Sequence, residues 1–204
     1  NNSEIAGNIT ESASAGNTFT QEGSGTLTLS GDNGYTGATA IDGGTLILSN
    51  DDPVAMTASS GFSGNGELRI QPAGADFNSS SGSSNALETS LFTFGEIKGG
   101  LVLGQDGKAA TIEIDNALTL DNTLTVYAGD LDINGVLTIN DATSGPAHEL
   151  HLHARTSADQ SAAIDASTLA LYGIGDFTLD DTGNVVDTLA GGSADNKLGS
   201  LTFV

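Results

Sequence analysis

Apolar and polar side chains alternate in short stretches along the chain, and similar stretches return after 19 residues. Thr-Leu-Thr-Leu-Ser at 26–30 is followed by Thr-Leu-Ile-Leu-Ser at 45–49. Alternation with a period of two predicts half-buried β-strands. Four later segments keep the same spacing: Thr-Ile-Glu-Ile-Asp at 111, Asp-Leu-Asp-Ile-Asn at 130, Glu-Leu-His-Leu-His at 149 and Thr-Leu-Ala-Leu-Tyr at 168.

Stacking at this period predicts columns of inward aliphatic side chains. We expect one column of Ile112, Leu131, Leu150 and Leu169, and a parallel one of Ile114, Ile133, Leu152 and Leu171. A second face follows the same period through Leu101, Leu120 and Ile139, and a third is indicated between them by Leu124 and Val126.

Three strands within about 19 residues are typical of an all-β solenoid. The predicted fold is a right-handed, three-sided parallel β-helix, in which stacked coils bury what no single coil can bury. An antiparallel sandwich of short strands with glycine turns is the alternative. Hairpins would not be expected to keep one period on two faces, so the solenoid is favoured.

The regular pattern fails in two places. The segment at about 71–98 contains Asn-Ser-Ser-Ser-Gly-Ser-Ser-Asn at 78–85, which has the composition of a linker. We expect it to be a loop inserted in one β-helix domain spanning 1–204, with Leu91, Phe92 and Phe94 returning to the wall. A smaller excursion is expected at 154–163.

The composition restricts the class of partner. Of 204 residues, 26 are Asp or Glu and 5 are Lys or Arg, which gives a formal net charge of −21. Nucleic acid and anionic membranes are bound through Lys and Arg, so neither is expected as a partner. The chain has 28 glycines and no cysteine, which fits an exported protein rich in tight turns. No stretch approaches the ~20 apolar residues of a membrane span, and the sequence reads as a segment of a larger exoprotein.

The stretch at 25–49, GTLTLSGDNGYTGATAIDGGTLILS, resembles the passenger-associated repeat of bacterial autotransporters. The matching positions are Gly31, Asn33, Tyr35, Thr36, Gly37, Gly43, Gly44, Thr45 and Leu46. Gly-Asn-Val-Val-Asp-Thr-Leu-Ala at 183–190, with Leu-Thr-Phe at 201–203, is similar to repeats of filamentous-haemagglutinin-type adhesins of two-partner secretion. Both resemblances imply a β-helix displayed on the outer surface of a Gram-negative cell, exported through an outer-membrane transporter.

The segment Asp130-Leu-Asp132-Ile-Asn134-Gly, with Asp141 at the twelfth position, nearly matches a Ca²⁺-binding loop. If it is a strand instead, alternate residues stand ~6.5 to 7 Å apart, too far to surround one ion. The strand interpretation is favoured, so no cofactor is expected, with Ca²⁺ at Asp130, Asp132 and Asn134 as the alternative.

His148, His151 and His153 are the only histidines, and with Glu149 they are candidate ligands for a transition metal. The 19-residue register places His151 over Asp132 and His153 over Asn134, on a solvated outward face. Rings on that face stack on sugars, so His151, His153 and Tyr172 are the candidate ligand-binding residues.

Two classes of function follow. The favoured hypothesis is a non-enzymatic adhesive stalk that binds surface or matrix glycans or further copies of itself in attachment, aggregation or biofilm formation. The alternative is a glycosidase or lyase on the same fold, which needs two carboxyl groups across a cleft. Pairs such as Asp51 with Asp52 and Asp180 with Asp181 lie at turns or on opposite strand faces, which does not favour that arrangement. A cation-dependent scaffold is a third hypothesis, to be separated by the effect of Ca²⁺ on the melting temperature.

Overall fold

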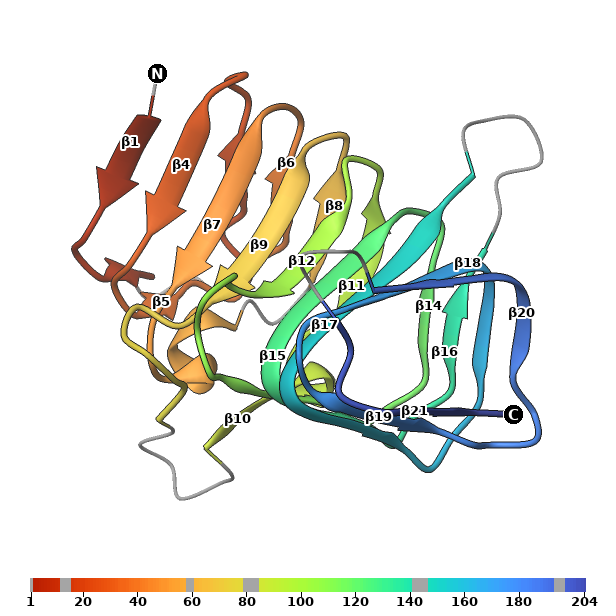
Figure 1. The fold of residues 1–204 in the computed structure, drawn as a ribbon. Coiled ribbons are helices and arrows are strands. Elements are labelled where there is room, and N and C mark those ends of the chain that lie inside the picture. Colours follow the sequence, from red (N-terminus) through yellow and green to blue (C-terminus); the bar gives the residue numbers. More distant parts are fainter. Residues whose placement is uncertain (1, 12–15, 58–60, 79–84, 141–146, 193–196) are drawn as a thin grey trace.

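The computed structural model describes residues 2–11, 16–57, 61–78, 85–140, 147–192 and 197–204. Its described residues form parallel strands and two short 3-10 helices, and no α-helix. The strands stack as a β-solenoid of about 8 turns, with roughly 23 residues between turns. Successive coils lie side by side from β1 at one end to β20 and β21 at the other (Figure 1). The all-β solenoid predicted from the sequence is therefore confirmed.

Each regular coil passes through three walls, which we name by their order along the coil. The first wall contains β1 (Asn2–Ile5), β4 (Thr26–Leu29), β7 (Thr45–Ser49), β9 (Glu67–Gln71), β12 (Leu101–Gly104) and parts of β15 (Leu124–Ile133), β17 (Glu149–Gln160), β18 (Ile164–Tyr172) and β20 (Val185–Gly191). The second wall contains β2 (Ile9–Thr10), β5 (Asn33–Gly34), η1 (Pro53–Met56), β10 (Ala86–Glu88), η2 (Thr89–Leu91), β13 (Thr111–Ile114), the later halves of β15 and β17, β19 (Asp176–Leu179) and β21 (Leu201–Phe203).

The third wall is made of two separate pieces. One piece contains β3 (Phe19–Gln21), β6 (Thr39–Ile41), β8 (Phe62–Gly64) and β11 (Phe94–Ile97), and the other contains β14 (Leu118–Leu120), β16 (Leu137–Ile139) and the early parts of β18 and β20. In the described part of the chain, β11 and β14 are not paired with one another. The third wall is therefore interrupted halfway along the solenoid.

Alternation along the strands builds a continuous aliphatic core. In the first wall, inward leucines and isoleucines pair from coil to coil and are fully buried, while their neighbours point outward. The members of two such columns are Leu29, Leu46, Leu48, Leu68, Ile70, Leu101, Leu103, Leu124, Val126, Leu150, Leu152, Leu169 and Leu171. Each coil alone would leave these side chains in water, so it is stacking that stabilises the fold.

The 19-residue period holds for some coils and fails for others. Thr26 pairs with Thr45, and Ile112 pairs with Leu131, as the period predicts. Leu131, however, pairs with Ala158, while Leu150 pairs with Leu124 and Leu169. The predicted column linking Leu131 to Leu150 is therefore wrong, and so is the parallel link from Ile133 to Leu152.

The long strands explain this error. β15 and β17 each run from the first wall into the second, with a register shift between Ala128 and Asp130. Each strand therefore carries alternating residues on both walls. The segment at 149–153 has the same alternation as 130–134 in the second half of β15, but residues 150–153 pair with 124–127 in its first half. Leu101 was also misplaced, because it lies in the first wall between Leu68 and Leu124, whereas Leu120 and Ile139 are paired as predicted.

The two predicted irregular segments also contain wall strands. Residues 71–98 include β10 and β11, and Phe77, Leu87 and Phe92 are buried in the core. Residues 79–84, at the centre of the linker-like stretch, lie outside the described residues. The excursion expected at 154–163 is wrong over most of its length, because β17 continues to Gln160 and buries Ala158.

Candidate functional site

Three ring-bearing residues form a stack on the outer surface of the first wall. Tyr127, His153 and Tyr172 point outward from β15, β17 and β18, at positions that pair directly from coil to coil. The ring centroids of Tyr127 and His153 are 4.3 Å apart, and those of His153 and Tyr172 are 4.5 Å apart. Because parallel coils repeat at about 4.8 Å, outward rings in register stack on one another.

His151 lies beside this stack. Its ring contacts Tyr172 edge-on at a centroid distance of 5.9 Å, and its Nε2 lies 2.6 Å from a carboxylate oxygen of Glu149. The structure thus brings together His151, His153 and Tyr172, the three residues chosen from the sequence. It adds Tyr127, which pairs with His153 in the neighbouring coil.

Burial lowers the pKa of His153, and the nearby His151 lowers it further, against the opposing effect of Asp106. A lowered pKa favours the neutral imidazole at neutral pH, so the middle ring of the stack is uncharged. A neutral stack of rings offers an aromatic surface without a fixed positive charge.

The pairings also correct the predicted neighbours of the histidines. His151 pairs with Thr125 and His153 with Tyr127, so neither lies over Asp132 or Asn134. His148 is separate from both, with its Nδ1 2.8 Å from the carbonyl oxygen of Asn140. Among the described residues, no group of three or more His, Cys, Asp or Glu side chains is placed to hold a metal ion.

The Ca²⁺ candidates lie on the outside of the second wall. Asp130 and Asp132 alternate with the buried Leu131 and Ile133 in β15, and Asn134 follows the strand. Ser157 donates a hydrogen bond of 3.0 Å to Asp130, and Ser161 donates one of 2.8 Å to Asn134. The extended backbone spreads the three side chains along a strand rather than around a point.

The second wall carries a column of like charges. Glu88, Glu113, Asp132 and Asp159 pair in succession from coil to coil. Burial raises the pKa of Glu113, and Glu88, Asp132 and Asp115 raise it further. Burial also raises the pKa of Asp132, with Asp159 and Asp130 adding to the effect. The column is an acidic surface whose carboxylates repel one another.

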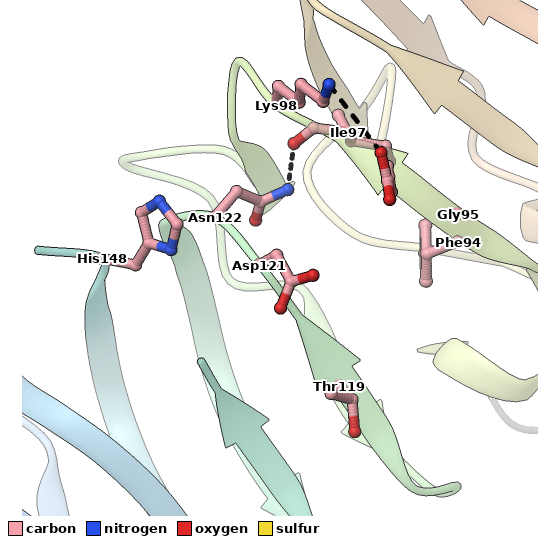
Figure 2. Close-up of a pocket in the computed structure, with 9 residues that line it drawn as sticks. Phe94, Gly95, Ile97, Lys98, Thr119, Asp121, Asn122 and His148 are labelled. Carbon is pink, nitrogen blue, oxygen red and sulfur yellow. Dashed lines mark hydrogen bonds and ion pairs between the residues drawn. The ribbon is translucent and has the colours of Figure 1, made fainter. Parts of the chain in front are cut away.

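A pocket occupies the interruption in the third wall. It has a volume of about 610 Å³ and lies between β11, which contributes Phe94 to Ile97, and the residues around β14 (Figure 2). Asn122 spans this gap by donating a hydrogen bond to the carbonyl oxygen of Ile97, while its own side-chain oxygen is buried without a partner. Composition carries no signal for this pocket, because the pocket arises where β11 and β14 do not pair with one another.

Two carboxylates line the pocket in the wall. Glu96 lies 3.8 Å from Lys98, and Asp121 accepts a 2.6 Å hydrogen bond from Asn140. The side chain of Glu96 is 75% exposed. Glu96 belongs to β11 and Asp121 follows β14, so the two carboxylates come from the two strands that border the gap.

Comparison with known families identifies one part of the chain. The model of the passenger-associated transport repeat matches residues 19–48, which form β3 to β7. No curated protein matches the chain, and no solved structure does. The matched repeat with its β-solenoid is consistent with an autotransporter passenger segment, a secreted or cell-surface type of protein. None of the helices in the described ranges is long and apolar enough to cross a membrane.

Proposed function

We propose that this chain, a β-solenoid that carries a passenger-associated transport repeat, is an adhesive stalk on the outer surface of a Gram-negative bacterium. The observation that carries the proposal is the place of the repeat in the fold. Residues 19–48 form two successive rungs of the first wall, and their leucines continue into the core of the following coils. The repeat is thus one section of a longer rod, which suits a spacer that holds binding surfaces away from the cell.

The outward faces support a role in attachment. Tyr127, His153 and Tyr172 give the first wall an aromatic surface. Such a surface suits neutral glycans of cells or matrix. The net charge of −21 keeps copies of the rod apart and opposes binding to polyanions. Each contact would be weak, and many displayed copies would supply strength through avidity. An outer-membrane transporter would act during export.

The test is competition on living cells. Bacteria that carry the parent protein are mixed with target cells or matrix, with and without the purified 204-residue chain. We expect the chain to inhibit aggregation or attachment, and a Tyr127→Ala, Tyr172→Ala double variant with an unchanged melting temperature to inhibit less. Protease treatment of intact cells should remove the segment from the surface. Lack of inhibition by the wild-type chain, or protection from the protease, would contradict the proposal.

A glycosidase is the second candidate, favoured by one observation: Glu96 and Asp121 both line the pocket in the third wall. Two carboxylates across a cleft are what glycoside hydrolysis needs. The assay is turnover of neutral oligosaccharides by the wild-type chain and by Glu96→Gln and Asp121→Asn. Cleavage that is lost in either variant would establish the enzyme. Cleavage that is absent, or equal in all three, would leave the adhesive function.

A third hypothesis is that the chain is a scaffold stabilised by Ca²⁺. It is tested by measuring the melting temperature of the chain with and without Ca²⁺. A Ca²⁺-dependent rise in melting temperature that is lost in Asp130→Asn with Asp132→Asn would support the scaffold. An unchanged melting temperature would exclude stabilisation through these residues.

A further inference from the structure

The stack of rings on the first wall ends at a glycine. Tyr127 pairs with His153 in the coil that follows it and with Gly104 in the coil that precedes it. One face of the Tyr127 ring is therefore covered by His153, at a centroid distance of 4.3 Å. The other face is turned toward a residue that has no side chain.

The backbone requires glycine at this position. Gly104 has a φ of 77°, and a Cβ atom built there would lie 2.0 Å from the carbonyl oxygen of Tyr127. Any other residue would meet both the strain of the left-handed region and a collision with the next coil. The open face of Tyr127 is thus built into the fold.

A pocket of about 350 Å³ lies over this open face. Its apolar surface comes from Tyr127, Ile47 and Val102. Polar side chains surround that surface: Arg69 and Gln71 from β9, and Gln105 and Asp106 from the turn after β12. The volume is at the small end of the range of about 300–1,000 Å³ found for ligand pockets, which suits one small ring rather than an extended chain.

We propose that this pocket binds one neutral pyranose unit of a glycan, stacked on the free face of Tyr127. A pyranose presents C–H groups on its face and hydroxyl groups around its edge. The face matches the aromatic ring of Tyr127. The hydroxyls match planar amide, carboxylate and guanidinium groups, which together both donate and accept hydrogen bonds. The proposal rests on the adhesive function and names the chemistry of one of its contacts.

The charges of the pocket select a neutral sugar over a charged one. Arg69 is the cation of the lining, and its Nε already donates to Glu67 at 2.5 Å. Asp106 also lines the pocket, in a chain of net charge −21. A uronate would meet a neutralised cation and a nearby carboxylate, so its charge gains no stabilisation.

The experiment measures sugar binding to the purified chain. Saturation-transfer NMR is run with methyl glycosides of neutral hexoses, with sodium glucuronate and with glucosamine as charged probes. The chain has no tryptophan and three tyrosines, so tyrosine fluorescence gives a second measure of binding. We expect a neutral glycoside to bind with a Kd on the order of 1 mM, and glucuronate to bind several-fold more weakly.

The variants separate the pocket from the rest of the surface. Tyr127→Ala should raise the Kd about tenfold, while Tyr127→Phe keeps the ring and should leave it nearly unchanged. Thr178→Ala is the control, because Thr178 is exposed on β19 in the second wall and does not line the pocket, and it should retain binding. If Tyr127→Ala fails to fold, Gln105→Ala combined with Asp106→Asn changes only side chains of the turn after β12 and should weaken binding in the same way.

The proposal is overturned if no neutral glycoside binds, or if glucuronate or glucosamine binds more tightly than the neutral glycosides. It is also overturned if folded Tyr127→Ala binds as well as wild type. If Tyr127→Ala does not fold, the same result with the Gln105→Ala, Asp106→Asn variant overturns it. Such a result differs from failure of the adhesive function. Without sugar binding, the chain would still compete for cell attachment if another surface of the stalk makes the contact.

Discussion

The acidic column of the second wall gives the sharpest test of the coil register. Asp132 pairs with Glu113 in one neighbouring coil and with Asp159 in the other. The 19-residue register also pairs Asp132 with Glu113, but it places His151 where the structure has Asp159. The substitution Asp132→Asn removes the charge and keeps the shape of the side chain, so its effect on stability tests whether both neighbours repel Asp132.

The magnitude follows from the two neighbours. Favourable cross-strand pairs contribute about 0.2–1 kcal/mol and like charges directly opposite are destabilising, so we take a cost of the same order for each like-charge pair. Asp132→Asn removes two such pairs and should raise the free energy of unfolding by about 1 kcal/mol at neutral pH and low salt. The gain should shrink in about 1 M salt, where the Debye length is roughly 3 Å. Asp165→Asn is the matched control, because Asp165 is exposed between Thr138 and Val185, and it should change stability by less than about 0.5 kcal/mol.

The pH dependence has a defined sign. Burial, with Asp159 and Asp130, raises the pKa of Asp132 in the folded protein above the usual value of 3.8. The folded state therefore binds this proton more tightly than the unfolded state, and its stability falls as pH rises from below 3.8 through the folded pKa. Asp132→Asn lacks this loss, so its advantage should be present at neutral pH and disappear near pH ~3.

The protein is unfolded with urea, which does not screen charges, and the unfolding is monitored by circular dichroism. A loss of stability in Asp132→Asn at neutral pH would refute the paired column. So would a gain that is the same at low and high salt, or one that Asp165→Asn reproduces.

Three further predictions use the same unfolding assay. Leu150→Ala, at a fully buried position between two paired leucines, should cost about 3–4 kcal/mol, and equal costs for Leu150→Ala and His151→Ala would contradict the inward and outward assignment. Gly104→Ala should lower the free energy of unfolding by about 1–3 kcal/mol or more, because Gly104 has a positive φ and a Cβ there would collide with Tyr127. An unchanged free energy of unfolding would contradict the requirement for glycine at this position. The lowered pKa of His153 means that wild type loses stability as pH falls below the unfolded value of about 6.5 toward the folded pKa, because the unfolded state protonates first. His153→Phe should keep the stack and reduce that loss, and an unchanged pH profile would contradict a half-buried ring that is neutral in the folded protein.

The sequence by itself determined the class of the fold and the orientation of side chains. Period-two alternation at Thr26 to Leu29 and at Thr45 to Ser49 was enough to predict paired parallel strands and a leucine column, and the structure confirms both. The reason is local: alternation fixes which side chains face the core whatever the neighbouring strand is. The same reasoning placed His151, His153 and Tyr172 on one outward surface.

Only the tertiary structure decided which coils are neighbours. Segments such as Leu124 to Tyr127 and Asp130 to Ile133 have the same alternation, so either half of β15 could pair with the start of β17 on pattern alone. The number of residues in the corners sets the choice, and this number varies from coil to coil while the pattern does not. Tyr127 was therefore missed as the first ring of the stack, although its outward direction could be inferred.

The pockets depend on the same pairing of strands between coils. The gap in the third wall exists because β11 and β14 do not pair, and the open face of Tyr127 exists because Gly104 is its neighbour. Neither relation is encoded within a single strand, since each joins residues separated by a whole coil. The alternating sequence specifies the walls of this solenoid, and the stacking of unequal coils creates the surfaces that a ligand can reach.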